Sequence, residues 1–446
     1  MTKKTADIYL YDQLVGKLEE NAEGEYTFFY LQSFLKTNPK QGISLTLPPR
    51  ETPYQSEKLF SFFDGLIPEG WLLDHAVKNW KLNTKDRMGL LMSVCADPIG
   101  ATHILAEGQT FQKDSNVHEA LEKVSKEESS QIKGYGKCLI SYRQLENEED
   151  LYHPNEVKKM FQSATNYPML DITLKDIENL AKIKVNQRLS VTGVQKKLSL
   201  HLDEHSESKR FTIVNFDGNF ILKPPSPDYP QMPEIEHLCM KMAKLVGLPV
   251  PDCALIPLKD GQLAYLVKRF DRNGQKKFYQ EDFCQLMEKQ TEDKYRSSLE
   301  KASKVIKNYC SPTLPYLLQF FDLNYYSFLI GNADMHLKNF SLVQNLKNKT
   351  YMLSPCYDLL STKILFPEDK EQTALALNAK KNKISKNDWL EFGKNMGLEQ
   401  KMIENSLKKF KRYTPKLLKF IDSSFLNDKN KELLKDQIAK ALIDDV

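Results

Sequence analysis

Two polar residues that could take part in a reaction lie in a loop between two apolar runs. The segment reads FLIGNADMHLKNFSLV and places Asp334 five residues before Asn339. In the catalytic loop of phosphoryl-transfer enzymes an Asp accepts the proton of the attacking hydroxyl, and an Asn at this distance binds magnesium. The same spacing occurs by chance in many chains. It therefore predicts an active site only if the rest of the chain supplies the remaining groups.

A second carboxylate follows further along the chain. Asp358 comes shortly after an apolar stretch, Tyr351–Leu353, that is typical of a strand. Magnesium takes one or two protein oxygens together with phosphate oxygens, and Asn339 and Asp358 would be its protein ligands. The residues equally allow Asp358 to be the N-cap of a short helix.

A lysine suited to phosphate binding ends a predicted strand. In GNFILKPP, Lys223 shares a face with Ile221 because side chains alternate along a strand. A lysine that shares a face with a buried isoleucine is poorly placed for the surface and well placed to bind a phosphate. The next predicted helix carries Glu234 and Glu236, and either could pair with Lys223. Both could equally be solvated acids favoured by the dipole of the first helical turn.

The elements that must hold these residues fall into three parts. Residues 1–106 alternate apolar and polar side chains and then change to a helical period, which predicts a small α+β unit. Residues 107–135 are polar and predict a linker, or an inserted surface loop. The remaining chain, 136–446, predicts a mainly β lobe over 136–280 and an α lobe over 281–446. We expect an α+β protein with the bilobal layout of protein kinases behind a small N-terminal subdomain.

Turn and cap residues predict individual elements. Asp217-Gly218 predicts a tight turn that closes a hairpin over 211–222. Gly247 predicts the end of a helix over 233–246, and a strand is expected over 264–270. Further helices are expected around 281–288, 296–308, 312–330, 386–396, 399–411 and 430–443.

Composition excludes several classes of protein. Of the 446 residues, 41% are hydrophobic and 27% charged, which is typical of a soluble globular protein. A net charge of +4 on this length gives no argument for direct nucleic-acid binding. No apolar run reaches the ~20 residues of a membrane span, and the N-terminus lacks the apolar core of a secretory signal. The seven scattered cysteines, without a CxxC, indicate reduced thiols in the cytoplasm.

Nine stretches, taken together and in order, carry a resemblance to a known family. The chain resembles the HipA-type serine/threonine kinases, the toxin halves of bacterial toxin–antitoxin pairs. The stretches cover about 55–105 and 185–390. They are FFDGLIPEG, LSVTGVQKKLSL, GNFILKPP, PEIEHLCMKMAKLVGLPVP, LVKRFDR, EDFCQLM, GNADMHLKNFSLV, LSPCYDLLST and LALNAKKNKIS.

The resemblance implies ATP and Mg²⁺ as cofactors. Asp334 would be the catalytic base, Asn339 and Asp358 would hold the metal, and Lys223 would hold the phosphates of ATP. Backbone groups of the strand at 266–270 would meet the adenine. The nucleotide-binding residues that the resemblance implies are Thr192, Gly193, Val194, Gln195, Lys196, Lys197, Lys223, Lys268, Phe270, Asp271, His336, Lys338, Asn339, Tyr357 and Asp358.

The resemblance also implies regulation and partners. Ser190 and Thr192 stand where the family and its HipT branch carry autophosphorylation sites that shut the enzyme down. The implied partners are a protein substrate, such as an aminoacyl-tRNA synthetase, and a HipB-like DNA-binding antitoxin. Nucleic acid would be contacted only through that antitoxin, and no membrane is involved. The alternative function is a catalytically silent partner that helps the antitoxin repress its operon.

Residues 1–106 raise a separate question about regulation. They resemble HipS, a small separate protein of the HipT branch, whose kinases lack this unit. Here the unit is joined to a kinase domain whose DMHLKNF loop is closer to that branch. The unit is expected to be either a permanent part of the fold or a tethered inhibitor.

Overall fold

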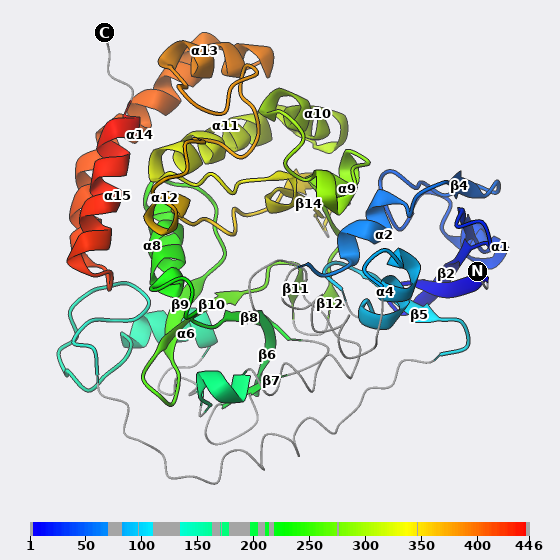
Figure 1. The fold of residues 1–446 in the computed structure, drawn as a ribbon, viewed down its shortest axis with the longest axis horizontal. Coiled ribbons are helices and arrows are strands. Elements are labelled where there is room, and N and C mark those ends of the chain that lie inside the picture. The colour runs from blue at the N-terminus through cyan, green and yellow to red at the C-terminus, as the bar shows by residue number, and fades with distance from the viewer. Residues whose placement is uncertain are drawn as a thin grey trace.

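The chain folds into antiparallel sheets and a set of helices, with the strands near the N-terminus on one side of the view and helices α14 and α15 on the opposite side (Figure 1). The computed structural model describes residues 3–69, 83–96, 98–109, 134–162, 170, 172–177, 197–203, 210–213, 218–273, 276–345 and 347–442. No helix in this part of the chain is both long and apolar enough to cross a bilayer.

The first part of the chain, called the N-terminal unit below (described residues of 3–109), is built on one antiparallel sheet. The sheet has the order β4-β3-β2-β1-β5. Its alternating side chains bury Ile8 and Phe28 in a core of their own, which also holds Phe63. The elements are β1 (Lys4–Leu10), β2 (Gln13–Glu20), β3 (Tyr26–Tyr30), α1 (Gln32–Thr37), β4 (Tyr54–Ser56), α2 (Ser61–Leu66), α4 (Arg87–Val94) and β5 (Thr102–Ala106). The predicted boundary near residue 106 stays a prediction, because most of 107–135 lies outside the described residues.

A second antiparallel sheet forms the β lobe. Its order is β7-β6-β8-β10-β9, and α8 packs on β9 and β10. As predicted, α8 ends just before Gly247, whose φ of +85° is left-handed. The elements are α6 (Pro154–Phe161), β6 (Leu198–Asp203), β7 (Arg210–Ile213), β8 (Phe220–Lys223), α8 (Met232–Leu245), β9 (Cys253–Pro257) and β10 (Leu263–Lys268).

The predicted hairpin over 211–222 is wrong. Strands β7 and β8 do not pair with each other, because both pair with β6, one on each side. Gly218 is needed for a different reason: a Cβ atom there would lie 2.0 Å from Ser199 Oγ of β6. The glycine therefore allows a close approach to β6.

The α lobe is assembled around α11, which is buried along its second half. Aromatic side chains of α11 pack on Trp389 and Phe392 of α13, with ring centroids 5.8 Å apart for Phe321 and Trp389. The elements are β11 (Arg272–Asn273), β12 (Lys276–Lys277), β13 (Gln280–Asp282), α9 (Phe283–Leu286), η1 (Thr291–Asp293), α10 (Leu299–Tyr309), α11 (Thr313–Ile330), η2 (Leu337–Asn339), β14 (Ser341–Gln344), β15 (Tyr351–Leu353), α12 (Thr362–Leu365), α13 (Lys386–Asn395), α14 (Gln400–Ser423) and α15 (Asp428–Ala441).

Helix α14 is longer than the predicted 399–411, because it continues through Pro415. Its buried side chains Phe410, Leu417 and Ile421 keep one face against the core beyond the proline. The Thr414 hydroxyl donates to the Phe410 carbonyl at 3.0 Å. Packing of this face therefore outweighs the backbone bond that the proline removes.

The N-terminal unit is joined to the α lobe by buried polar contacts. Glu281 of β13 accepts hydrogen bonds from the Ser44 hydroxyl at 2.6 Å and the Leu45 amide at 2.8 Å. Helix α2 lies against α9, where the Gln285 side chain donates to the Phe62 carbonyl at 2.7 Å. Because these groups are buried, the contact between the two parts depends on their hydrogen bonds being made.

Glu281 should make stability depend on pH. Burial raises the pKa of Glu281 from 4.5 to about 8. Between these values the folded protein keeps a proton that the unfolded chain has released, so the free energy of unfolding falls as pH rises. In Glu281→Gln this fall should be weaker, by up to about 1.4 kcal/mol per pH unit, in urea unfolding at pH 5, 6.5 and 8. Glu292→Gln, at an exposed acid, should behave as wild type, and equal slopes for Glu281→Gln and wild type would contradict the prediction.

Candidate active site

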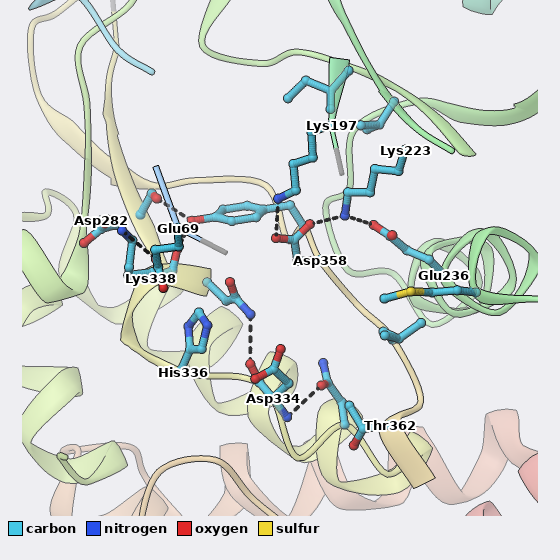
Figure 2. A pocket seen from close by; sticks show the side chains of 18 of the residues that line it. Glu69, Lys197, Lys223, Glu236, Asp282, Asp334, His336, Lys338, Asp358 and Thr362 are labelled. Carbon is cyan, nitrogen blue, oxygen red and sulfur yellow. Dashed lines mark hydrogen bonds and ion pairs between the residues drawn. The ribbon is translucent and has the colours of Figure 1, made fainter. Parts of the chain in front are cut away.

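One cavity brings together side chains from the N-terminal unit, the β lobe and the α lobe. Its volume is about 720 Å³, and it lies between the β lobe and the loop that follows α11. Figure 2 shows Lys197 and Lys223 entering from one side, Asp334 and His336 on the opposite side, and Asp358 between them. Residues predicted from distant segments therefore line a single space.

Lys223 is the centre of a buried ion cluster. It ends β8 and is 3% exposed. Its ammonium nitrogen lies 2.5 Å from Glu236 Oε1 and also contacts Asp358 Oδ1 (Figure 2). Of the two acids that the sequence left open, Glu236 is thus the partner and Glu234 is not.

Burial and charge pairing together set the pKa values of this cluster. Burial would raise the pKa of Asp358, but the ammonium groups of Lys197 and Lys223 outweigh it and hold that pKa well below its usual range. Burial would lower the pKa of Lys223, but Asp358 and Glu236 raise it overall. For Lys197, 3.4 Å from Asp358, burial prevails and lowers the pKa. One ionised carboxylate is therefore shared by two lysines.

The backbone at Asp358 is unusual. Its φ of +54° is left-handed, a region that Asp tolerates better than most residues. The alternative role as an N-cap is wrong, because α12 begins after Ser361. A non-glycine residue held in this region is a feature that clusters at functional sites.

The opposite side of the cavity holds Asp334. Its side chain is exposed there, and its Oδ1 accepts a hydrogen bond from the Tyr295 hydroxyl. The protein around Asp334 keeps some of the water from its carboxyl group and so raises its pKa. The hydrogen bond from Tyr295 partly offsets this rise. A carboxylate with a raised pKa is a stronger base.

Hydrogen bonds within the loop fix Asp334 and Asn339 relative to each other. The side-chain nitrogen of Asn339 donates to the backbone carbonyl of Asp334 at 2.9 Å. The backbone amide of Asp334 donates to the side-chain oxygen of Asn332 at 3.1 Å. Because Asn339 uses its nitrogen in this way, its oxygen is the atom that could bind a cation.

His336 is neutral. Burial lowers the pKa of His336 to about 3. Its ring packs edge-to-face on that of Tyr295, with the ring centroids 4.9 Å apart. Within the part of the chain that the structure describes, its buried Nδ1 makes no hydrogen bond. A buried ring nitrogen that lines a cavity in this state is suited to bind a ligand.

Lys338 is turned toward the N-terminal unit. Its nitrogen lies 2.9 Å from Glu69 Oε1 and 3.2 Å from the Gly65 carbonyl (Figure 2). Lys294 lies 2.5 Å from the other oxygen of the same carboxylate. Burial would raise the pKa of Glu69, but the two lysines hold it at about 2. Lys338 lines the cavity as predicted, but its charge is already matched by Glu69.

The strand residues predicted to bind the nucleotide line the cavity as well, namely Lys268, Phe270 and Asp271. The Lys268 amide donates to the Asp252 carbonyl at 2.9 Å. Both oxygens of Asp271 accept hydrogen bonds from Arg269, at 2.8 and 2.5 Å. The roles of Lys268 and Asp271 toward a nucleotide stay predictions.

Tyr357 connects Phe270 to the loop at 331–340. Its hydroxyl donates to the Lys338 carbonyl at 2.9 Å and lies 2.5 Å from the Ser341 hydroxyl. Its ring centroid lies 5.5 Å from that of Phe270. Phe270 and Tyr357 thus form one wall of the cavity.

The segment 190–197, called the cradle below, was predicted to bind the nucleotide and to carry the autophosphorylation sites, and it falls mostly outside the described residues. This holds for Ser190, Thr192, Gly193, Val194, Gln195 and Lys196. Their roles, including autophosphorylation, stay predictions. Lys197, at the end of the cradle, is described and reaches Asp358 as noted above.

Sequence reasoning missed Glu69, Lys294 and Tyr295. Their partners are far away in the sequence, and no local pattern connects them. The sequence did hold a signal that Glu236 faces the core. Its neighbours on the same helix face, at i+3, i+4 and i+7, are apolar and buried, whereas the residue at i+7 from Glu234 is Lys241. Those neighbours are Cys239, Met240 and Ala243.

Two family models match the chain. Residues 189–417 match the HipA-like C-terminal domain, and residues 6–105 match the HipA N-terminal domain. A Haemophilus influenzae protein named as a candidate kinase is 33% identical over 257 residues, which are 51% of this chain and 72% of that protein. The Sinorhizobium fredii protein Y4mE, also named as a candidate kinase, is 23% identical over 411 residues, 89% of this chain and 87% of that protein.

A solved structure shares the fold. It is that of Shewanella oneidensis HipA in complex with HipB and operator DNA. The TM-score is 0.69 at 18% identity, with 98% of this chain and 96% of that chain covered. The predicted α+β, bilobal kinase-like fold class is thereby confirmed.

The buried ion cluster should dominate the stability of the β lobe. Lys223→Met leaves Glu236 and Asp358 without their shared cation, which should cost about 3–5 kcal/mol of unfolding free energy at pH 7. The cost should shrink at pH 5, because the Glu236 carboxyl group, left without a cation, then binds a proton. Urea unfolding measures both. Lys244→Met removes a half-exposed lysine of the same helix as Glu236, and a Lys223→Met protein as stable as this control would refute the prediction.

Proposed function

Because the chain belongs to the HipA family, we propose that it is an ATP- and Mg²⁺-dependent serine/threonine protein kinase and the toxin of a toxin–antitoxin pair. One observation carries this proposal above all. The Lys223–Glu236 ion pair and Asp358 face Asp334 across one cavity. A strand lysine paired with a helix glutamate, near a metal-binding Asp, is the arrangement that protein kinases need for activity.

The donor set of the cavity fits magnesium and a nucleotide. Among the described residues, no three His, Cys, Asp or Glu side chains are grouped as metal ligands. Asn339 and Asp358 would instead hold Mg²⁺ as two oxygen donors, and phosphate oxygens would complete its shell. Lys197 and Lys223 would hold the phosphates, since a triphosphate needs cations in a site that excludes water.

Asp334, Tyr295 and His336 have roles in the phosphoryl transfer. When bound, Mg²⁺-ATP supplies the phosphoryl group. Asp334 accepts the proton of the substrate hydroxyl, and its raised pKa makes it a better base. Tyr295 orients the Asp334 carboxylate through its hydrogen bond. His336, which is neutral, keeps Nδ1 as a hydrogen-bonding atom beside the base.

The proposal extends to partners. The structurally similar Shewanella HipA is solved with HipB and operator DNA, which supports a HipB-like antitoxin as the partner of this chain. DNA would then be contacted through that antitoxin. A translation-related protein such as an aminoacyl-tRNA synthetase is the proposed target, and Ser190 or Thr192 the proposed site of self-phosphorylation. We expect the protein to act in the cytoplasm.

Removal of the proposed base should abolish transfer. Asp334→Asn keeps the size of the side chain but cannot accept the proton, so the rate should fall ~10²–10⁴-fold. The measurement is label transfer from γ-labelled ATP with Mg²⁺ to the protein itself and to a bacterial extract. Phosphoamino-acid analysis of the labelled proteins should return serine or threonine.

Asp428→Asn, at an exposed acid in the first turn of α15, is the matched control and should keep the wild-type rate. The wild-type sample is first shown by intact mass to carry no phosphate. If this sample labels neither itself nor any extract protein, the kinase proposal fails. A gel shift of operator DNA with a HipB-like repressor, with and without the chain, then tests the silent co-repressor function.

A further inference from the structure

One carboxylate of the N-terminal unit lies inside the catalytic cavity. Glu69 follows α2, and one of its oxygens lies 2.9 Å from Lys338 of the α lobe (Figure 2). Its other oxygen lies 2.5 Å from a second lysine of the α lobe, Lys294. All three side chains are at most 15% exposed. Three buried charges therefore meet at the edge of the site, and Glu69 is the acid that joins the two lysines.

The two lysines lie beside the residues proposed to do the chemistry. Lys294 directly precedes Tyr295, whose hydroxyl donates to Asp334. Lys338 directly precedes Asn339, whose side chain donates to the Asp334 carbonyl. The Lys294 carbonyl also accepts a hydrogen bond from the Leu337 amide at 3.1 Å. Glu69 thus holds the two segments that position Asp334 and Asn339.

Further contacts hold Glu69 in place. The Gly65 carbonyl accepts a hydrogen bond from Lys338 at 3.2 Å. The Asp64 side chain accepts from the Thr291 amide at 2.7 Å. A Cβ atom on Gly65 would lie 2.5 Å from Gln285 Cγ, so α2 approaches α9 as closely as a glycine permits. The segment 61–69 is therefore fitted to the α lobe.

We propose that Glu69 is a positioning residue, and that the N-terminal unit completes the active site of its own chain through it. Without this carboxylate, two buried ammonium groups would repel each other beside the catalytic loop. Lys338 would then move toward other acids or toward the phosphates, and the loop would lose its fixed position. The unit is thus a permanent part of the site and not a tethered inhibitor. The catalytic consequence rests on the proposed kinase function, whereas the hold on the loop does not.

The first test is hydrogen exchange of the full-length protein, because it needs no activity. Glu69→Gln removes the charge and keeps the size of the side chain. Amide exchange of peptides that cover 334–340 should become about tenfold faster, with little change in α14 or α15. Glu20→Gln is the matched control, since Glu20 is a buried acid of the same unit that binds Lys4 and Tyr26 instead. Exchange at 334–340 equal to that of the control would overturn the hold by Glu69.

The second test is phosphoryl transfer from γ-labelled ATP at saturating ATP and Mg²⁺, together with the stoichiometry of ADP binding. In Glu69→Gln the rate should fall at least about tenfold, while one ADP still binds per chain. A rate that is unchanged or raised overturns the proposal, as does a rate that falls only in proportion to lost ADP sites, which indicates a merely structural role. If wild type is inactive but exchange at 334–340 still responds to Glu69→Gln, the kinase function fails and the hold by Glu69 stands.

Discussion

Buried positive charge is the constraint on which the rest of this structure depends. Lys223 lies almost entirely out of water, where an unpaired ammonium group would cost several kcal/mol. Its charge is matched by Glu236 from α8 and by Asp358 from the segment before α12. The sheet, the helix and the α lobe must therefore keep a fixed relation for this lysine to remain charged. The neighbouring acids in turn hold the ammonium group at the edge of the cavity.

The same principle operates a second time at the other edge of the cavity. Glu69 is to Lys294 and Lys338 what Asp358 is to Lys197 and Lys223: one carboxylate shared by two lysines. The second cluster includes the N-terminal unit, so the two family models that match this chain describe parts that share one site. Buried hydrogen bonds such as that of Gln285 to the Phe62 carbonyl reinforce the connection.

The sequence predicted the parts of the fold that depend on local pattern. Helix α11 and the end of α8 at Gly247 follow from apolar periodicity and a glycine cap, and both were placed within a residue or two. Errors arose where distant contacts decide. The glycine at 218 was read as a turn because its neighbour across the sheet, Ser199, cannot be known from a local window. The helix predicted over 399–411 continues to Ser423 through Pro415, because tertiary packing carries it on.

The candidate site divides in the same way. The spacing of Asp334 and Asn339 and the strand position of Lys223 were visible locally, and all three line the cavity. Glu69 and Tyr295 were invisible, because an ion pair or hydrogen bond across the fold leaves no periodic trace in a single sequence. Their contribution depends on geometry that only the assembled chain provides.

The order of the site's pieces along the chain affects how the protein is made. Glu69 leaves the ribosome long before Lys338, on the order of ten to fifty seconds earlier at ordinary rates of synthesis. The helix that leads into the catalytic loop is covered by α15, whose Gln437 donates to the carbonyls of Phe328 and Leu329 at 3.4 Å. A growing chain therefore makes the parts of the site one after another, and the contact of α15 with α11 is among the later ones that can form.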